Sequence, residues 1–137
     1  MANPNPKISK IECLQLRSPH ASPDDCDGAV DTAVIRITAD NGVYGLGETD
    51  APPNAIAALL ETPTAHIWSR SVRDVLLGEN PLEVEQLWDK LYEGTIYHGR
   101  RGLGIMLISA IDIPASIQTS GLEPALRRRL SEGPLDR

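Results

Sequence analysis

The alternation of apolar and polar residues predicts three β-strands in the first third of the chain. Residues 31–40 alternate with the period of a half-buried strand, and residues 7–18 and 43–48 are rich in apolar residues that charged or small residues separate. The alternation places three apolar side chains of the middle segment on one face: Ala33, Ile35 and Ile37. We therefore expect an antiparallel meander with one covered face.

A tight hairpin is predicted between the second and third of these strands. The segment Asp40-Asn41-Gly42 separates them, and Asn and Gly both tolerate the positive φ that a type I′ turn demands at its two central positions. We expect Asn41 and Gly42 to fill those positions, with the third strand following directly.

Helices are predicted after Glu48, and residues 80–94 form the strongest of them. Asn80 can cap this helix, Pro81 falls at the first helical position, and Gly94 can end the helix in the left-handed conformation. Its apolar residues recur at helical spacing and form one stripe: Val84, Leu87, Trp88, Leu91 and Tyr92.

Residues 103–113 are the natural partner of that stripe. Nearly every side chain there is apolar, as in a helix buried on all sides, and Pro114 marks the expected end of the helix. Strands followed by helices are typical of the segregated α+β class, so we expect a three-stranded antiparallel meander followed by a small helical bundle.

Size and charge narrow the possible functions. The 137 residues, 41% of them apolar, suit one ordinary domain, whereas a barrel enzyme needs about 250 residues. A net charge of −6 without a basic stripe argues against nucleic acid as a partner. No signal peptide or membrane span is apparent, so we expect a cytoplasmic protein without a membrane partner, in which Cys13 and Cys26 are free thiols.

Three segments carry a resemblance to a known family. The stretches "VYGLGET", "NPLEVEQLWDKLY" and "YHGRRGLGIMLISAIDI" resemble the N-terminal capping domain of the mandelate racemase and muconate lactonizing enzyme group of the enolase superfamily. The resemblance covers residues 7 to 113. It predicts an enolase-like N-terminal domain over residues 1–113 and a poorly ordered tail over residues 114–137, which contains an arginine triplet and lacks the family pattern.

The resemblance implies a two-domain enzyme whose cap covers a (β/α)8 barrel. In this family three barrel carboxylates hold Mg²⁺, and a barrel Lys or His removes the proton α to the carboxylate of a sugar acid or hydroxy acid. We therefore expect the capping domain of an acid-sugar dehydratase or racemase, truncated before its barrel, without a cofactor of its own and inactive alone. The alternative is a stand-alone α+β module for oligomerisation or ligand binding.

The resemblance also implies two specificity loops, one after the first strand and one after the third. Their candidate residues are His20, Asp24, Asp25, Glu48, Thr49 and Asp50. The acidic first loop, residues 19–29, lacks the ordered oxygen spacing of a calcium site, so we expect a solvated loop without metal. The carboxylate of Glu48 is suited to a substrate hydroxyl, to capping the next helix, or to an ion pair with Arg100.

Three further candidates, Tyr97, His98 and Arg100, precede the predicted buried helix. Arg100 is suited to clamping a carboxylate or to a structural ion pair. His66 stands apart from them, and we expect a structural role for it. The apolar run 103–113 has too few partners within about 110 residues to cover all its faces, which predicts a homo-oligomer through this helix.

Overall fold

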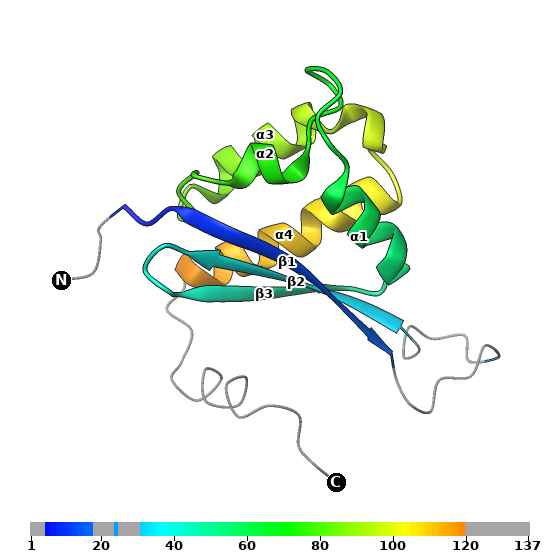
Figure 1. Cartoon of the computed structure of the whole chain (residues 1–137), viewed down its shortest axis with the longest axis horizontal. Helices are drawn as coiled ribbons and strands as arrows, with labels where there is room; N and C mark the ends of the chain where they lie inside the picture. Colours follow the sequence, from blue (N-terminus) through cyan, green and yellow to red (C-terminus); the bar gives the residue numbers. More distant parts are fainter. Residues whose placement is uncertain (1–4, 18–23, 25–30, 120–137) are drawn as a thin grey trace, which may run out of the picture.

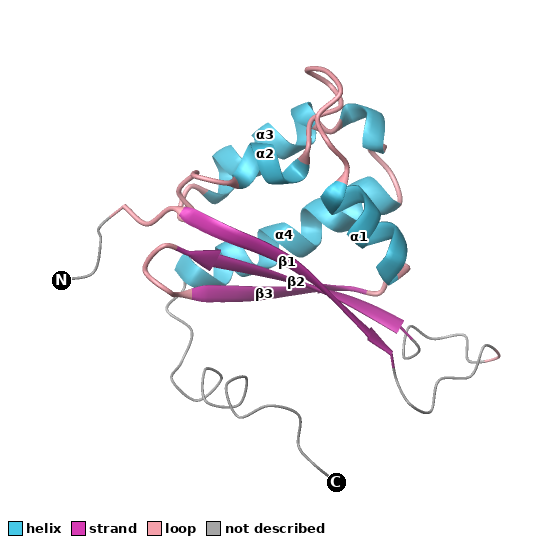
Figure 2. Ribbon diagram, in the orientation of Figure 1, coloured by secondary structure: helices cyan, strands magenta, loops and turns pink. Residues whose placement is uncertain are grey.

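One face of a three-stranded antiparallel sheet carries all the helices of the described chain (Figure 1). The computed structural model describes residues 5–17, 24 and 31–119, with the backbone alone for residues 115–119. The elements are β1 (Ile8–Arg17), β2 (Asp31–Ala39), β3 (Tyr44–Thr49), α1 (Pro53–Glu61), α2 (Val72–Leu76), α3 (Val84–Gly94), a 3₁₀ turn η1 (Ile96–His98) and α4 (Leu103–Thr119). Helices α1 and α4 lie against the sheet, and α2 and α3 form a layer beyond them (Figure 2). The predicted α+β class is confirmed.

The sheet follows the predicted alternation. The strand order is β1-β2-β3, and Ala33, Ile35 and Ile37 of β2 are fully buried under the helices. In β1 the register shifts between Ile8 and Lys10, so Ile8 and Ile11 both point into the core although they lie three residues apart. The apolar inner face of the sheet is the floor on which the helices pack.

The hairpin between β2 and β3 has a different turn from the predicted one. Its loop contains three residues, with Gly42 N donating to Ala39 O at 3.0 Å and Ala39 N donating to Val43 O at 2.8 Å. Gly42 has a φ of 81°, whereas no residue other than glycine has positive φ in the described chain. A type I turn followed by a left-handed glycine needs only that one residue, so the type I′ prediction for Asn41 was wrong.

Helix α3 begins later than the sequence indicated. Its first residue is Val84, while Asn80 Oδ1 accepts a hydrogen bond from Leu82 N at 3.0 Å in a turn that precedes the helix. Gly94 has no positive φ. It is the last helical residue and is buried, and a Cβ there would lie 3.3 Å from Arg70 Cδ. The predicted stripe is confirmed, because Leu87 and Leu91 are buried in the core.

Helix α4 continues through Pro114 to Thr119, so the predicted end at Ile113 was wrong. Proline inside a helix leaves the carbonyl of the fourth preceding residue, here Ala110, without its N–H donor. That carbonyl faces β3: a Cβ built on Gly47 would lie 1.9 Å from Ala110 O. A Cα–H group of Gly47 therefore points at the carbonyl oxygen of Ala110, which forms a weak hydrogen bond with it. Any larger residue at position 47 would prevent this close approach. Residues 120–137 lie outside the described chain, and the domain boundary stays a prediction.

Burial of α4 is one-sided. Leu107, Ile108, Ala110 and Ile111 are buried, whereas Ile113 on the other side is 42% exposed. The expectation of a helix buried on all sides was wrong, because the sheet, α1 and α3 together cover only part of its circumference. No helix in the described residues combines the length and apolarity needed to cross a lipid bilayer.

Arg73 joins β1, α1 and α2 at the β1 edge of the sheet. Its Nη1 donates to the carbonyl of Ile11 in β1 at 2.6 Å, and its Nε donates to Glu61 Oε2 of α1 at 3.1 Å. These bonds hold the pKa of the Glu61 carboxyl below its usual range, with the attraction of the positive charge as a smaller contribution. One guanidinium thus fixes α1 and α2 against β1.

The close approach of α4 to β3 predicts a large cost for Gly47→Ala. The new methyl group has no space beside Ala110 O and Pro114 Cδ, so we expect a loss of about 3 kcal/mol or more in the free energy of unfolding. Gly78→Ala is the matched control: Gly78 has a φ of 82° but nothing within 4 Å, so strain alone should cost about 1 kcal/mol. Urea unfolding followed by circular dichroism measures both, and equal costs would contradict the packing argument.

Candidate functional site

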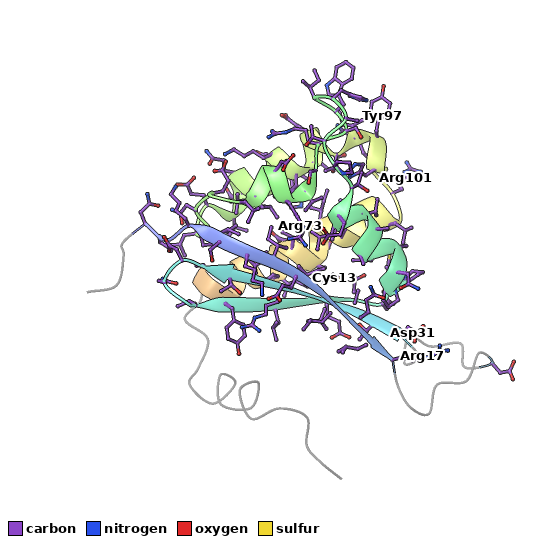
Figure 3. The ribbon with its side chains drawn as sticks, viewed as in Figure 1. Cys13, Arg17, Asp31, Arg73, Tyr97 and Arg101 are labelled. Carbon is purple, nitrogen blue, oxygen red and sulfur yellow. The ribbon has the colours of Figure 1, made fainter. Side chains whose placement is uncertain are left out.

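Three strand ends meet at one end of the sheet. In the antiparallel register Arg17 pairs with Asp31, and Ala33 pairs with Thr49. The segment that joins β1 to β2 and the segment that follows β3 therefore start from the same end of the sheet, where Figure 3 places Arg17 and Asp31. Arg17 Nε lies 3.4 Å from Asp31 Oδ1, an exposed ion pair that contributes little stability.

Glu48 is held in place by its neighbour on β2. Thr32 Oγ1 lies 3.0 Å from Glu48 Oε1 and 3.1 Å from the carbonyl oxygen of Thr49, so its single hydroxyl proton is shared between two acceptors. Neither structural alternative predicted for Glu48 is present. Helix α1 has no side-chain cap, and the guanidinium of Arg100 lies over the Tyr92 ring, 4.1 Å from its centroid. The Glu48 carboxylate is exposed, close to the bend that follows β3.

The two residues after Glu48 have different surroundings. Thr49 is buried, and its Oγ1 accepts a hydrogen bond from Ala51 N at 3.2 Å, which fixes the bend between β3 and α1. Asp50 is exposed. The bend is therefore rigid at Thr49 while the carboxylates on both sides of it face solvent.

An open groove of about 510 Å³ lies between this bend and α4. Its seven lining residues are Glu48, Thr49, Asp50, Ile105, Met106, Ser109 and Ile113. The structure thus brings together the three candidates from the predicted third-strand loop. The four α4 residues were not predicted, because an apolar run gives no sign of which of its faces the sheet leaves open.

The candidates from the first loop lie mostly beyond the described chain. His20 and Asp25 are outside the described residues, and Asp24 is exposed. That this loop binds no metal stays a prediction. Among residues 5–17, 24 and 31–119 no group of three or more His, Cys, Asp or Glu side chains is placed to hold a metal ion. The described residues therefore do not fit the magnesium site that the resemblance implies for the whole enzyme.

The three remaining candidates do not line the groove. Tyr97 is exposed at the opposite end of the domain from Arg17 and Asp31, next to Trp68 (Figure 3). His98 is half-buried, and both of its ring nitrogens are buried without a hydrogen-bond partner. Burial lowers the pKa of His98 below its usual value, because the imidazolium cation loses hydration. Residues that are adjacent in the sequence thus serve different regions of the fold.

Cys13 is a free thiol on β1, as predicted, while Cys26 lies outside the described residues. Partial burial raises the pKa of the Cys13 thiol, and the nearby negative charge of Glu61 raises it further. The thiol is therefore a poor nucleophile at neutral pH.

A three-stranded meander with helices on one face defines an α+β domain of the enolase N-terminal type. No family model matches the chain. In sequence it is 32% identical over 82 residues to the L-rhamnonate dehydratase of Saccharopolyspora erythraea, which is 60% of this chain and 19% of the dehydratase. It is 31% identical over 80 residues to the D-galactarolactone cycloisomerase of Agrobacterium fabrum, which is 58% of this chain and 19% of that enzyme.

Solved structures agree. A crystal structure provisionally classed as a racemase superimposes with a TM-score of 0.76 at 30% identity, covering 88% of this chain and 30% of that one. The 3,6-anhydro-D-galactonate cycloisomerase of Zobellia galactanivorans gives a TM-score of 0.63 at 28% identity, covering 80% and 27%. The predicted resemblance is confirmed: the chain is similar to the N-terminal part of enzymes of the mandelate racemase and muconate lactonizing enzyme group of the enolase superfamily. Its matches span about a fifth of the length of the curated relatives.

The buried imidazole predicts a pH-dependent stability. A His pKa that is lower in the folded state than in the unfolded state means that the unfolded chain takes up the proton first, so stability falls as pH drops below about 6.5. We expect the free energy of unfolding to decrease between pH 8 and pH 5.5, and the decrease to be smaller in His98→Leu. His66→Gln, at an exposed histidine, is the control and should keep the wild-type decrease. Identical pH profiles for all three proteins would contradict the assignment to His98.

Proposed function

We propose that this domain is the capping domain of a magnesium-dependent enzyme that acts on acid sugars, a dehydratase or a racemase. In this proposal the groove residues contact the substrate and contribute to specificity, while a barrel domain supplies the chemistry. The observation that carries the proposal is the meeting of the strand ends with the groove of Glu48, Asp50 and α4. The names of the similar enzymes, an L-rhamnonate dehydratase and a D-galactarolactone cycloisomerase, support the substrate class.

The charge of the groove determines how an acid sugar can approach it. Glu48 and Asp50 are exposed carboxylates, so they repel the carboxylate end of the substrate and accept hydrogen bonds from its hydroxyl groups. The substrate therefore presents its polyol end to the cap. The contact of Thr32 with Glu48 keeps one acceptor in a fixed position, which reduces the entropy lost on binding.

The opposite wall of the groove is mostly apolar. Ile105, Met106 and Ile113 of α4 offer packing surface to the carbon chain of a sugar, and Ser109 adds one hydroxyl among them. Closing such a wall over a substrate excludes water from it, which strengthens the polar contacts inside the site. This combination of an acidic edge and an apolar wall suits a polyhydroxylated ligand better than a purely apolar one.

No residue of the described chain is proposed as a magnesium ligand. A racemase of Streptomyces coelicolor that shares this fold has been solved with bound magnesium. When bound in such enzymes, the metal stabilises the negative charge formed on proton removal. The residues of this chain are proposed to orient the substrate and exclude water only, and no proton transfer is assigned to them.

A chimeric enzyme tests the proposal. Residues 5–114 of this chain would replace the matching N-terminal part of the Saccharopolyspora erythraea L-rhamnonate dehydratase, and kcat and KM would be measured on a panel of acid sugars. We expect turnover, and we expect Glu48→Gln to raise KM for the preferred sugar about tenfold, because a charged hydrogen-bond acceptor is lost.

Glu85→Gln is the matched control for this chimera. Glu85 is an exposed carboxylate on α3 that does not line the groove, so its removal should leave KM unchanged. Equal KM values for the two variants would contradict a substrate contact at Glu48. A folded chimera without turnover, beside an active parent enzyme, would contradict the capping role itself.

A further inference from the structure

The groove between the β3 bend and α4 carries charge of one sign. Two of its lining residues, Glu48 and Asp50, are exposed carboxylates. The other lining residues are uncharged: Thr49, Ile105, Met106, Ser109 and Ile113. Within the part of the chain that the structure describes, the groove therefore has no Lys, Arg or His in its walls. Two carboxylates without a cation beside them give the groove a negative potential.

The arginine on the same face of the sheet is turned away from the groove. Arg36 of β2 pairs with Leu46 of β3, so along β3 it lies between Tyr44 and Glu48. Its guanidinium lies over the Tyr44 ring, 4.2 Å from the centroid, which is the side away from Glu48. The positive charge is thus used in a cation–π contact and does not offset the groove carboxylates.

The arginine at the end of the sheet also has another partner. Arg17 of β1 forms its ion pair with Asp31 of β2. None of the ion pairs among residues 5–17, 24 and 31–119 includes Glu48 or Asp50. Both groove carboxylates therefore keep their full negative charge toward a ligand.

The α4 wall of the groove also disfavours an additional charge. Ile105, Met106 and Ile113 offer no hydrogen-bond donor to an anion, and Ser109 offers one hydroxyl. A carboxylate that moves from water to such a wall loses hydration that the wall does not replace, whereas a methyl or hydroxymethyl group loses far less. Closure over a substrate lowers the local dielectric constant and strengthens the repulsion from Glu48 and Asp50.

We propose that the groove admits only an uncharged end of an acid sugar, so the enzyme acts on acid sugars with one carboxylate and rejects those with a carboxylate at each end. The inference rests on the proposed function, in which the polyol end of the substrate meets the cap. Glu48 and Asp50 are then specificity-determining residues, because each repels a second carboxylate. The bend that Thr49 fixes holds both of them beside the groove.

Three sugars of one configuration test the inference in the chimera with the L-rhamnonate dehydratase barrel. L-Rhamnonate carries a methyl group at C6, L-mannonate a hydroxymethyl group and L-mannarate a second carboxylate. Turnover of L-rhamnonate is measured at constant ionic strength, with the other two sugars as competing ligands. We expect the inhibition constant of L-mannarate to exceed that of L-mannonate about tenfold, because like charges repel in the closed groove.

Variants of the cap on the same barrel separate its effect from that of the barrel. Asp50→Asn keeps the shape of the side chain, so it should lower the inhibition constant of L-mannarate about tenfold without lowering that of L-mannonate. Glu48→Gln should also lower the constant of L-mannarate, while it raises KM for L-rhamnonate. Structural damage does not move these two constants in opposite directions. The control Glu85→Gln should change none of them.

The outcomes distinguish this inference from the proposed function. An active chimera that binds L-mannarate as tightly as L-mannonate would overturn the inference and leave the capping role intact. So would an Asp50→Asn variant that lowers both inhibition constants equally. A folded chimera without turnover would contradict the capping role, and the inference with it.

Amide NMR of the full 137-residue chain gives a second measurement that needs no barrel. At equal concentration and ionic strength, L-mannonate should shift the amide signals of Thr49, Asp50 and Ser109 more than L-mannarate does. Asp50→Asn should reduce this difference. Equal shifts with the two sugars in the wild-type chain would overturn the inference.

Discussion

The packing of α4 on β3 is the constraint on which the rest of the domain depends. Hypothetical Cβ atoms on Gly45 and Gly47 would lie 2.6 Å from Pro114 O and 1.9 Å from Ala110 O, so the helix backbone rests directly on the strand backbone. The strand needs glycine at both positions because a side chain there would collide with the helix backbone. On the helix, Pro114 leaves the carbonyl of Ala110 without its N–H donor, and this carbonyl faces Gly47. Each of these features is unfavourable in an isolated strand or helix. They are tolerated together because the contact between the two elements uses both.

The same contact determines the position of the candidate site. Since α4 crosses the sheet with Ala110 over Gly47, its preceding turns lie beside Thr49 and Asp50, at the end where β3 leaves the sheet. The open side of those turns becomes one wall of the groove, and the bend fixed by Thr49 becomes the other. A helix held farther from the strand by larger side chains would leave no defined space there. The groove is thus a consequence of backbone packing rather than of any single polar residue.

Local patterns predicted the elements of this fold better than their ends. Alternation in β2 and the stripe of α3 were read correctly because burial on one face repeats with the period of the element. The predictions based on capping and turn residues were wrong at Asn80 and Asn41. Each side chain accepts a hydrogen bond from the backbone N–H two residues later, in a turn that the sequence alone does not distinguish from a helix cap or a type I′ turn. The continuation of α4 past Pro114 depends on glycines about 70 residues away in β3. Information of that kind is absent from any local window.

The candidate residues separate for a related reason. Glu48, Thr49 and Asp50 stay together because they end a single strand, whereas Tyr97, His98 and Arg100 lie where the chain changes direction between α3 and α4. Gly99 and Gly102 both have positive φ there, and a Cβ on Gly104 would lie 2.1 Å from Gly99 O, so the reversal is tight. In such a turn neighbouring side chains point in different directions: Tyr97 toward Trp68 and Arg100 toward Tyr92. Adjacent polar residues therefore predict a shared site poorly when glycines turn the chain between them. Adjacent polar residues at the end of one strand predict a shared site better.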